Sequence, residues 1–549
     1  KTQRTMANPP SLFFFVTVLL SLSLSLASSP HKSPPPQCHN IEASALLQFK
    51  QSLAINMCAT PFDSPKLESW TMSRQRNNCC SWAGIECDNT TGHVISLDLS
   101  GSCLYGSLSF NTTLSKLSKL DHINLAYNNF RNSSIPSMSG LFPRLTYLNL
   151  SYSVLSGSVP RTISQLSKLS VLDLQYNKGL VLEGHTFEAI VGNLTRLEYL
   201  HLSYVHISST VPKMISNLSS LTSLSLPNCG LYGRFPAKVF NLNNLEFIHL
   251  GENIDLVGSL PQFNSSSPLA YLVLYSTRFG GLLPESIGNL QSLKMMSIWL
   301  CGFFGKIPTS FQNLTKLKWL ELSYNYFEET NPSSLSWIGK QTELTLLGLN
   351  YISFPGNIPA YLANLTQLSV FTLQACQLTG SLPSWLSKMT NLQILELASN
   401  KLQGPVPESF SQLTQLTYLD LDHNNLSGKV DFNIFLDLEA LTSLFLSGNN
   451  LSLVHVGDRN TTSGRFYQLS LGSCNLQQFP VFLHDQTNLA FLDLSKNNIH
   501  GQVPLWIWNV TRDFLEYVDL SNNFITGFES DPGVFPWPRA IWIALNNNM

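Results

Sequence analysis

The sequence predicts an α/β solenoid, a superhelix of short stacked repeats with one parallel β-sheet along its concave face. Two observations predict this fold. The unit L-x-x-L-x-L-x-x-N-x-L-x-G-x-(I/V/L)-P recurs from Leu97 to the end of the chain, with a clear copy at Leu392, Leu395, Leu397 and Asn400. Its asparagine returns on a step of about 24 residues, and units of this length stack instead of forming separate globular domains. The recurring asparagines are Asn128, Asn177, Asn253, Asn325, Asn400, Asn424, Asn449, Asn497, Asn523 and Asn548.

Each letter of the unit has a physical role. The leucines of L-x-L face inward from a short strand, because alternate residues of a strand point to opposite sides. One unit cannot bury that face alone, so neighbouring units share a continuous core. The asparagine amide both donates and accepts hydrogen bonds, and it satisfies backbone groups of the turn that follows the strand. Period and pattern are those of leucine-rich repeats, and we expect about 18–19 of them over residues 94–549.

Cysteine replaces the asparagine in four repeats. These residues are Cys229, Cys301, Cys376 and Cys474. A thiol is small, tolerates burial and is a weak donor, so we expect all four to be reduced. A metal site is disfavoured because the four cysteines lie on different turns of the coil, so the sequence predicts no metal.

Composition and charge narrow the function. Charged residues make up 12% of the 549 residues and the net charge is −2, which gives no electrostatic basis for nucleic-acid binding. The sequence contains no nucleophile elbow, phosphate-binding loop or zinc-protease motif. We therefore expect a binding protein with no catalytic residue and no cofactor.

The amino-terminal segment predicts the secretory pathway. Residues 12–26 are apolar or serine and small residues follow, as in a signal peptide covering residues 1–29 with translation starting at Met6. Thirteen N-x-S/T sequons fit a glycosylated, secreted surface. They are Asn89, Asn111, Asn132, Asn149, Asn193, Asn217, Asn264, Asn313, Asn364, Asn425, Asn450, Asn460 and Asn509.

Residues 30–93 are expected to cap the first repeat. Apolar positions at helical spacing predict a helix over residues 42–53, and Trp70 and Trp82 are large apolar anchors. The remaining six cysteines gather in and just after this segment, where an oxidising compartment allows disulfides. They are Cys38, Cys58, Cys79, Cys80, Cys87 and Cys103. Six cysteines allow fifteen connectivities, and spacing does not choose among them.

The cap and several repeats resemble a known family. The cap carries Ala45-Leu46-Leu47, Ser69-Trp70, Cys79-Cys80-Ser81-Trp82, Gly84, Cys87 and Gly92-His93-Val94; later repeats carry Gly428-Lys429-Val430-Asp431-Phe432 and Ser473-Cys474-Asn475-Leu476. These motifs resemble the plant extracellular leucine-rich-repeat receptor-like proteins, the group of the tomato leaf-mould and wilt resistance receptors. The resemblance implies disulfides Cys38–Cys79 and Cys80–Cys87, which leaves Cys58 with Cys103.

The resemblance also implies a function. Such a protein is a kinase-less cell-surface receptor that binds a pathogen- or wall-derived protein or peptide. It signals defence through an adaptor receptor kinase, paired through a membrane helix, and a co-receptor kinase that joins near the last repeats. A full-length protein would lie in the plasma membrane and face the outside of the cell.

The chain departs from this family at Met549, which falls inside a repeat, and no later segment is apolar enough to span a membrane. We therefore interpret the chain as C-terminally truncated. Either the gene model is incomplete, or the product is a truncated form secreted to the apoplast that could act as a decoy.

The concave face is the candidate ligand-binding surface. In L-x-x-L-x-L-x-x-N the residues beside the leucines face solvent there, and exposed aromatic side chains are the usual energetic anchors of interfaces. The candidates are Tyr147, Tyr152, Tyr176, Tyr199, His201, Tyr204, Phe247, His249, Tyr271, Tyr275, Trp299, Trp319, Glu321 and Tyr324, and later repeats look less aromatic. High β-propensity alone would also explain aromatic residues on strands. Two interruptions of the spacing, residues 178–186 and 454–465, are further candidates.

Two alternative functions remain open. A secreted inhibitor resembling the polygalacturonase-inhibiting proteins would share the cap and the repeat, although such inhibitors have about half as many repeats. A developmental peptide receptor would have the same build as the immune receptor, and the sequence does not separate the two.

Overall fold

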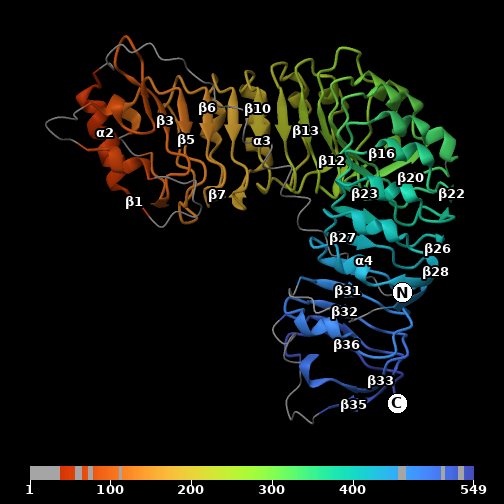
Figure 1. Cartoon of the computed structure of the whole chain (residues 1–549). Coiled ribbons are helices and arrows are strands. Elements are labelled where there is room, and N and C mark those ends of the chain that lie inside the picture. Colours follow the sequence, from red (N-terminus) through yellow and green to blue (C-terminus); the bar gives the residue numbers. More distant parts are fainter. Residues whose placement is uncertain are drawn as a thin grey trace.

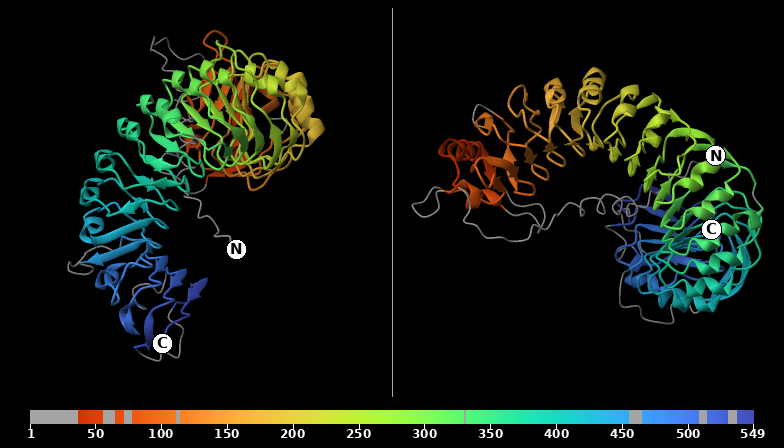
Figure 2. Two further views of the ribbon diagram at one scale, coloured as in Figure 1. Left: turned by 90° about the vertical axis from the view of Figure 1, so that its right-hand side faces the viewer. Right: turned by 90° about the horizontal axis from the view of Figure 1, so that it is seen from above.

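The repeats stack into one continuous curved superhelix (Figures 1 and 2). The computed structural model describes residues 37–55, 65–71, 78–110, 114–329, 331–454, 465–507, 514–529 and 537–549. The expected signal peptide, Cys58, the sequons Asn111, Asn460 and Asn509, and most of the 454–465 interruption lie outside these residues.

One long parallel sheet lines the concave side of the described superhelix, with one short strand from each repeat. Its strands are β3 (Val94–Asp98), β5 (His122–Asn124), β6 (Tyr147–Asn149), β8 (Val171–Asp173), β10 (Tyr199–His201), β11 (Ser223–Ser225), β13 (Phe247–His249), β15 (Tyr271–Val273), β17 (Met295–Ser297), β19 (Trp319–Glu321), β21 (Leu346–Gly348), β23 (Val370–Thr372), β25 (Ile394–Glu396), β27 (Tyr418–Asp420), β29 (Ser443–Phe445), β31 (Gln468–Ser470), β32 (Phe491–Asp493), β34 (Tyr517–Asp519) and β36 (Trp542–Ala544). Strand β2 (Ile85–Cys87) pairs antiparallel with β3 and forms one edge; β36 forms the other. The sheet is therefore open, as expected for a solenoid.

The strand pattern separates the core from the binding face. In the strands of this sheet from β5 to β34 the middle residue, such as Leu200, Leu272 or Leu395, is buried. The residues before and after it point to the concave side. Pairing is in register from repeat to repeat, for example Tyr199 with Ser223 and His201 with Ser225, so equivalent positions form continuous columns across the sheet.

The asparagine side chains connect the repeats, as predicted. Asn400 Nδ2 donates to the carbonyl oxygens of Leu373 (2.7 Å) and Leu397 (3.0 Å). Its Oδ1 accepts from the backbone N–H groups of Cys376 (2.9 Å) and Leu378 (3.0 Å) in the preceding repeat. One amide thus satisfies buried backbone groups of two successive turns.

The four cysteines in the asparagine position are free and buried. The Cys376 thiol donates to the carbonyl oxygens of Leu349 (3.2 Å) and Gln374 (3.4 Å), so it replaces the donor function of the amide. Burial raises the pKa of the Cys301 thiol to about 11 and raises the pKa values of the other three. These thiols are therefore protonated at neutral pH, which matches the prediction that they are reduced structural residues.

A second group of short strands follows the asparagine turns along one flank. They are β7 (Ser156–Ser158), β9 (Gly179–Val181), β12 (Tyr232–Arg234), β14 (Asp255–Gly258), β16 (Arg278–Leu282), β18 (Gly302–Gly305), β20 (Tyr326–Phe327), β22 (Gly356–Asn357), β24 (Leu378–Thr379), β26 (Gln403–Gly404), β28 (Asn425–Asp431), β30 (Asn450–Val454), β33 (His500–Val503) and β35 (Phe524–Phe528). They correspond to the L-x-G-x-(I/V/L)-P part of the unit. Its glycine adopts a positive φ, 80° at Gly404, which glycine tolerates without a Cβ clash.

Short helices cover the convex side. Most are 3₁₀ helices that begin directly after the proline of the unit, whose fixed φ suits a helix start. They are η3 (Leu114–Lys116), η4 (Arg161–Gln165), η5 (Lys213–Asn217), η6 (Ala237–Asn241), η7 (Glu285–Asn289), η8 (Thr309–Asn313), η9 (Pro332–Lys340), η10 (Ala360–Asn364), η11 (Ser384–Lys388), η12 (Glu408–Gln412) and η13 (Val481–Asp485), with α-helices α3 (Gly184–Asn193) and α4 (Asn433–Leu436) in the same row. The 178–186 interruption leads into α3, which packs beside η4 and η5. It therefore lies away from the concave face.

The amino-terminal cap closes the first end of the core. It contains helix α2 (Asn40–Gln51), η1 (Lys66–Ser69), η2 (Cys79–Ser81) and strand β1 (Leu53–Ile55), which pairs antiparallel with β4 (Leu104–Gly106). The predicted helix therefore ends two residues early, because Leu53 pairs as a strand. The indole rings of Trp70 and Trp82 are buried and stack 5.5 Å apart.

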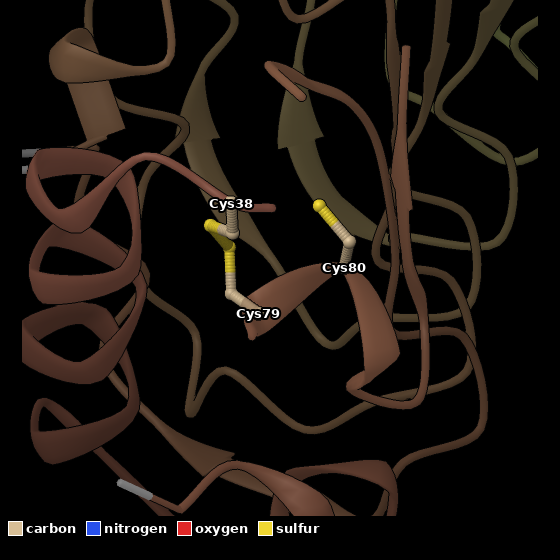
Figure 3. A group of neighbouring side chains, drawn as sticks. All are labelled: Cys38, Cys79 and Cys80. Carbon is tan, nitrogen blue, oxygen red and sulfur yellow. A yellow bond between two sulfur atoms is a disulfide. The ribbon is translucent and has the colours of Figure 1, made fainter. Parts of the chain in front are cut away.

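Disulfides fasten the cap. Cys38 pairs with Cys79 and Cys80 pairs with Cys87. The Cys38, Cys79 and Cys80 sulfur atoms lie within 4.8 Å of one another (Figure 3), but disulfide sulfurs are not thiolate ligands for a metal. Because Cys58 lies outside the described residues, its pairing with Cys103 stays a prediction.

We predict that Asn400→Ala destabilises its repeat by about 3 kcal/mol, because buried backbone groups lose their partners. The check is hydrogen exchange at the amides of Cys376 and Leu378, which should accelerate in this variant. The control Gln403→Ala, at an exposed position of β26, should leave both amides protected. Equal protection in the two variants would contradict this role for the amide.

Candidate functional site

The predicted aromatic residues lie on the concave wall of the superhelix, in columns set by the strand register. The first residues of their strands are Tyr147, Tyr199, Tyr271 and Trp319. The last residues of their strands are His201, His249 and Glu321. Tyr275 and Trp299 lie two residues before the asparagine position of their repeats, and Tyr152, Tyr176, Tyr204 and Tyr324 lie one residue before it. All of these side chains are half-buried.

Phe247 is the exception, and the prediction that it faces solvent is wrong. Its side chain is only 5% exposed. The Tyr271 ring packs against it at 5.7 Å between centroids, the His249 ring at 6.3 Å and the His201 ring at 6.5 Å. Phe247 is therefore covered by these neighbouring rings, and they provide the accessible surface.

Four tyrosines of the column before the asparagine position form a stack. Tyr127, Tyr152, Tyr176 and Tyr204 follow one another with centroid separations of 4.7, 4.3 and 4.8 Å. Each adopts a positive φ, between 51° and 60°, a conformation that is uncommon outside glycine. The turn geometry of the repeat imposes this conformation and aims successive rings in parallel.

Glu252 joins this stack to the rest of the wall. Its carboxylate accepts hydrogen bonds from Tyr204 Oη (3.2 Å), Tyr275 Oη (2.8 Å) and Asn228 Nδ2 (2.8 Å). These donors come from three different repeats. A carboxylate that holds two phenol groups fixes their orientation, so this part of the surface is preorganised for a partner.

Beyond Glu252 the rings form a continuous series. His249 lies 5.5 Å from Tyr275, which lies 6.3 Å from Trp299. Trp299 lies 6.0 Å from Tyr324, which lies 4.5 Å from Tyr351. A rigid, half-exposed aromatic surface thus extends over the repeats from Tyr199 to Tyr351.

The histidines of the wall are uncharged. Burial lowers the pKa of His201 to about 4 and the pKa of His249 to about 3, with a contribution to the latter from nearby His201. His201 Nε2 lies 2.7 Å from Ser223 Oγ, and Asp173 lies 4.0 Å from the other ring nitrogen. This set resembles a hydrolase triad only in residue type, because the Ser223 side chain is buried.

The carboxyl-terminal half of the wall carries half-buried acids. Burial is the main reason that the pKa of Glu396 is raised to about 7, with further repulsion from Asp420 and Glu321. Burial likewise raises the pKa of Glu321. The aromatic surface therefore borders on an acidic surface in the following repeats.

Several residues of this wall were not predicted from the sequence. Tyr127, Tyr351 and Glu252 occupy the same column as Tyr152 and Tyr204, so counting back one residue from each asparagine position would have found them. The later repeats carry fewer concave aromatic residues, as expected, but they are not without them. A second series begins at Tyr418 and Phe445 and continues through Phe491, Tyr517 and Trp542, with the last three rings 4.2 and 4.3 Å apart.

The described sequons differ in accessibility. Nine asparagines are exposed: Asn89, Asn132, Asn193, Asn217, Asn264, Asn313, Asn364, Asn425 and Asn450. Asn149 is different, because it lies on β6 of the concave sheet and is half-buried. Its side chain donates to Tyr147 Oη (3.4 Å) and accepts from the Ser151 N–H (2.9 Å). Asn149 is thus a poor acceptor for a glycan.

Within the part of the chain that the structure describes, no helix is long and apolar enough to cross a lipid bilayer.

Comparison with known proteins identifies the repeats and the cap. The family model described as "Leucine rich repeat N-terminal domain" matches residues 39–88, and the "Leucine rich repeat" model matches residues 366–426. A further repeat model matches residues 316–338 and 488–510. These matches cover both the disulfide-bonded cap and the regular repeats.

Plant receptor-like proteins are similar in sequence. Receptor-like protein 6 of Arabidopsis thaliana is 37% identical over 538 residues, which cover 91% of this chain and 54% of that protein. Receptor-like protein Cf-9 of Solanum pimpinellifolium is 38% identical over 291 residues, 50% of this chain and 32% of that protein. The chain thus spans about half the length of the first relative and about a third of the second.

A solved plant receptor has a similar structure. The plant peptide hormone receptor RGFR1, in complex with RGF2, superposes with a TM-score of 0.59 and 26% sequence identity. The match covers 85% of this chain and 80% of that receptor.

We predict that Glu396→Gln stabilises the fold at pH 8 but not at pH 4. Because the folded-state pKa of about 7 lies above the ordinary value of 4.5, the carboxyl group binds its proton more tightly when folded. That stabilisation is fully present below pH 4.5 and is lost as pH rises through 7. The gain in the variant at pH 8 should be at most about 3 kcal/mol, measured by unfolding at both pH values. Glu188→Gln, on the exposed surface of α3, is the control. An equal gain at pH 4 and pH 8 would contradict the assigned pKa.

Proposed function

Because this chain belongs to the plant leucine-rich-repeat receptor-like proteins, we propose that its concave aromatic wall binds an extracellular protein or peptide ligand. The family is non-enzymatic, in line with the absence of catalytic motifs from the sequence. The relatives are receptor-like proteins, which is consistent with an extracellular or secretory-pathway location for this chain.

One observation carries this proposal. Half-exposed rings from Tyr199 to Tyr351 form one continuous surface on a rigid sheet. Aromatic side chains that are already fixed lose little conformational entropy on binding, so they contribute strongly to an interface. The Glu252 hydrogen bonds hold two of these residues in place before a ligand arrives.

We further propose that the ligand is pathogen- or wall-derived and that the receptor acts in defence. The similarity to Receptor-like protein Cf-9 and the family resemblance of the cap and repeats support this. Signalling would require partner receptor kinases: an adaptor kinase through a membrane helix and a co-receptor kinase near the last repeats. The half-buried Tyr517 and the exposed Trp542, whose rings stack, offer a surface for the co-receptor.

A developmental peptide receptor is the second candidate. It is supported by the structural similarity to RGFR1, a peptide hormone receptor whose structure contains RGF2. Both candidates use a concave surface and a peptide ligand, so they predict the same binding residues and differ in the source of the ligand.

We predict that ligand binding depends on the wall and not on the flank. Tyr271→Ala and Trp319→Ala should each weaken binding by roughly tenfold or more, because each removes a half-exposed aromatic anchor. The measurement is binding of fractionated pathogen culture filtrate, plant wall digest and plant secreted peptides to the immobilised glycoprotein. The matched controls are Tyr232→Ala and Tyr326→Ala, which remove exposed tyrosines from the flanking strands β12 and β20.

The fractions also separate the candidates. A ligand from the pathogen or wall fraction favours the defence receptor, and one from the plant peptide fraction favours the developmental receptor. A ligand whose affinity falls in the flank variants but not in the wall variants would overturn the proposed binding surface.

A further inference from the structure

The last residues of five successive strands form a row at the carboxyl-terminal border of the aromatic wall. Glu321, Gly348, Thr372, Glu396 and Asp420 are the last residues of β19, β21, β23, β25 and β27, and the strand register places them side by side. We call these five residues the acidic row. Three carboxyl groups therefore face the same stretch of the concave surface.

The glycine of the row makes room for a carboxylate. Glu321 bends over Gly348, and a Cβ atom on that glycine would collide with the Glu321 carboxylate oxygens. Glu321 Oε1 accepts from the Ser323 N–H (2.9 Å), and Glu396 Oε2 accepts from Asn350 Nδ2 (3.3 Å). Among the described residues, neither glutamate forms an ion pair with a lysine or arginine. Both carboxyl groups are thus held in place by neutral donors, and their charge is uncompensated.

Thr372 provides an independent sign of a missing partner. Its neighbour Phe371 is fully buried in the core, so Thr372 points to the concave side between Gly348 and Glu396. Its side chain is only 7% exposed, yet its hydroxyl oxygen has no hydrogen-bond partner. A buried hydroxyl without a partner costs about 1–3 kcal/mol, so such groups usually complete their bonding with a ligand or water.

Aromatic side chains border the row. The two outer strands of the row, β19 and β27, begin with Trp319 and Tyr418. On the other side, Tyr324 and Tyr351 pack 4.5 Å apart, and Tyr324 Oη donates to Gln374 (3.1 Å). Aromatic faces beside carboxylates favour a planar cation, which combines ion pairing with cation–π contact.

We propose that the acidic row binds the guanidinium group of an arginine side chain in a peptide ligand. This inference rests on the proposed function, because it specifies one residue of the ligand that the concave wall binds. Glu321 and Glu396 accept the guanidinium N–H groups, and Thr372 Oγ1 accepts a further one. A guanidinium carries five donors in a fixed fork, so it satisfies several acceptors at once, whereas an ammonium group has only three.

Binding should release a proton. The titratable groups around Glu396 are Asp420 and Tyr418 on β27, Glu321 on β19, Tyr324 in the turn after β19 and the Cys376 thiol in the turn after β23. Thr372 on β23 and Gln374 in the turn after it are uncharged. Because Glu396 is partly protonated at neutral pH, a bound cation lowers its pKa and expels that proton. Affinity for the cation should therefore fall as pH is lowered from 8 to 5.

The test compares a synthetic arginine probe with two counterparts in which citrulline or lysine replaces the arginine. Acetyl-Gly-Ser-Gly-Arg-Gly-Ser-Gly-amide is compared with its citrulline counterpart, which replaces the guanidinium by a neutral urea of the same shape. Binding to the glycosylated full chain is measured by titration calorimetry at pH 7, where Glu396 is partly protonated, in two buffers with different ionisation enthalpies. We expect the arginine probe to bind at least tenfold tighter, with proton release, and a lysine probe to bind more weakly than the arginine probe.

Variants locate the binding. Glu321→Gln with Glu396→Gln should abolish the preference for arginine, and Thr372→Val should reduce it severalfold. The control, Glu188→Gln with Glu285→Gln, removes two exposed carboxylates from convex helices α3 and η7 and should leave the preference intact. Unchanged melting temperatures or small increases would show that the glutamine variants are folded.

Equal binding of arginine and citrulline probes, or a preference that survives in the Glu321 and Glu396 variant, would overturn this inference. Such a result would leave the proposed function standing, because that function is tested with Tyr271 and Trp319 variants and natural ligand fractions. Conversely, a wall that binds no ligand fraction would overturn the proposed function without changing the preference for arginine.

Discussion

The hydrogen bonds of the asparagine side chains are the constraint on which the rest of this structure depends. Each amide bonds to backbone groups of its own turn and of the preceding repeat, as Asn400 does with Leu397 and Cys376. The turn is buried, so water cannot replace these bonds. The turn geometry therefore repeats faithfully along the chain, and with it the direction in which each strand presents its side chains.

The turns and the leucine core stabilise this fold, so the residues at the concave positions are free to vary. Leucine packing and asparagine bonds do not involve the residues that face inward to the curve, so those residues can be chosen for recognition. Some choices oppose stability. Glu396 is half-buried beside other acids, and Thr372 has an unsatisfied hydroxyl. Recognition surfaces commonly carry such local costs, which the long core of the remaining repeats offsets.

Most of the fold was predictable from the sequence, because the residue pattern of one repeat determines which residues form its strand, its turn and its core. Strand positions, the asparagine bonds and the buried thiols such as Cys376 all followed from one unit. The site was predictable only in outline. Phe247 and Tyr271 occupy equivalent positions, and only the packing of neighbouring rings shows that one is buried. The hydrogen bonds of Glu252 could not be predicted, because its partners Tyr204 and Tyr275 lie about two repeats and one repeat away in sequence.

The stacked tyrosines carry a consequence for how such a receptor can evolve. Tyr127, Tyr152, Tyr176 and Tyr204 hold a left-handed backbone that costs roughly 1 kcal/mol for each residue with a side chain, and the equivalent position holds Gly448 in a later repeat. The same left-handed backbone occurs in this column at Leu300, Ala375, Ser399 and Lys496, so the turn and not the tyrosine sets this cost. One side chain can therefore replace another in this column at little change in backbone strain. The column is a set of positions at which the surface offered to a partner can change while the turn stays the same.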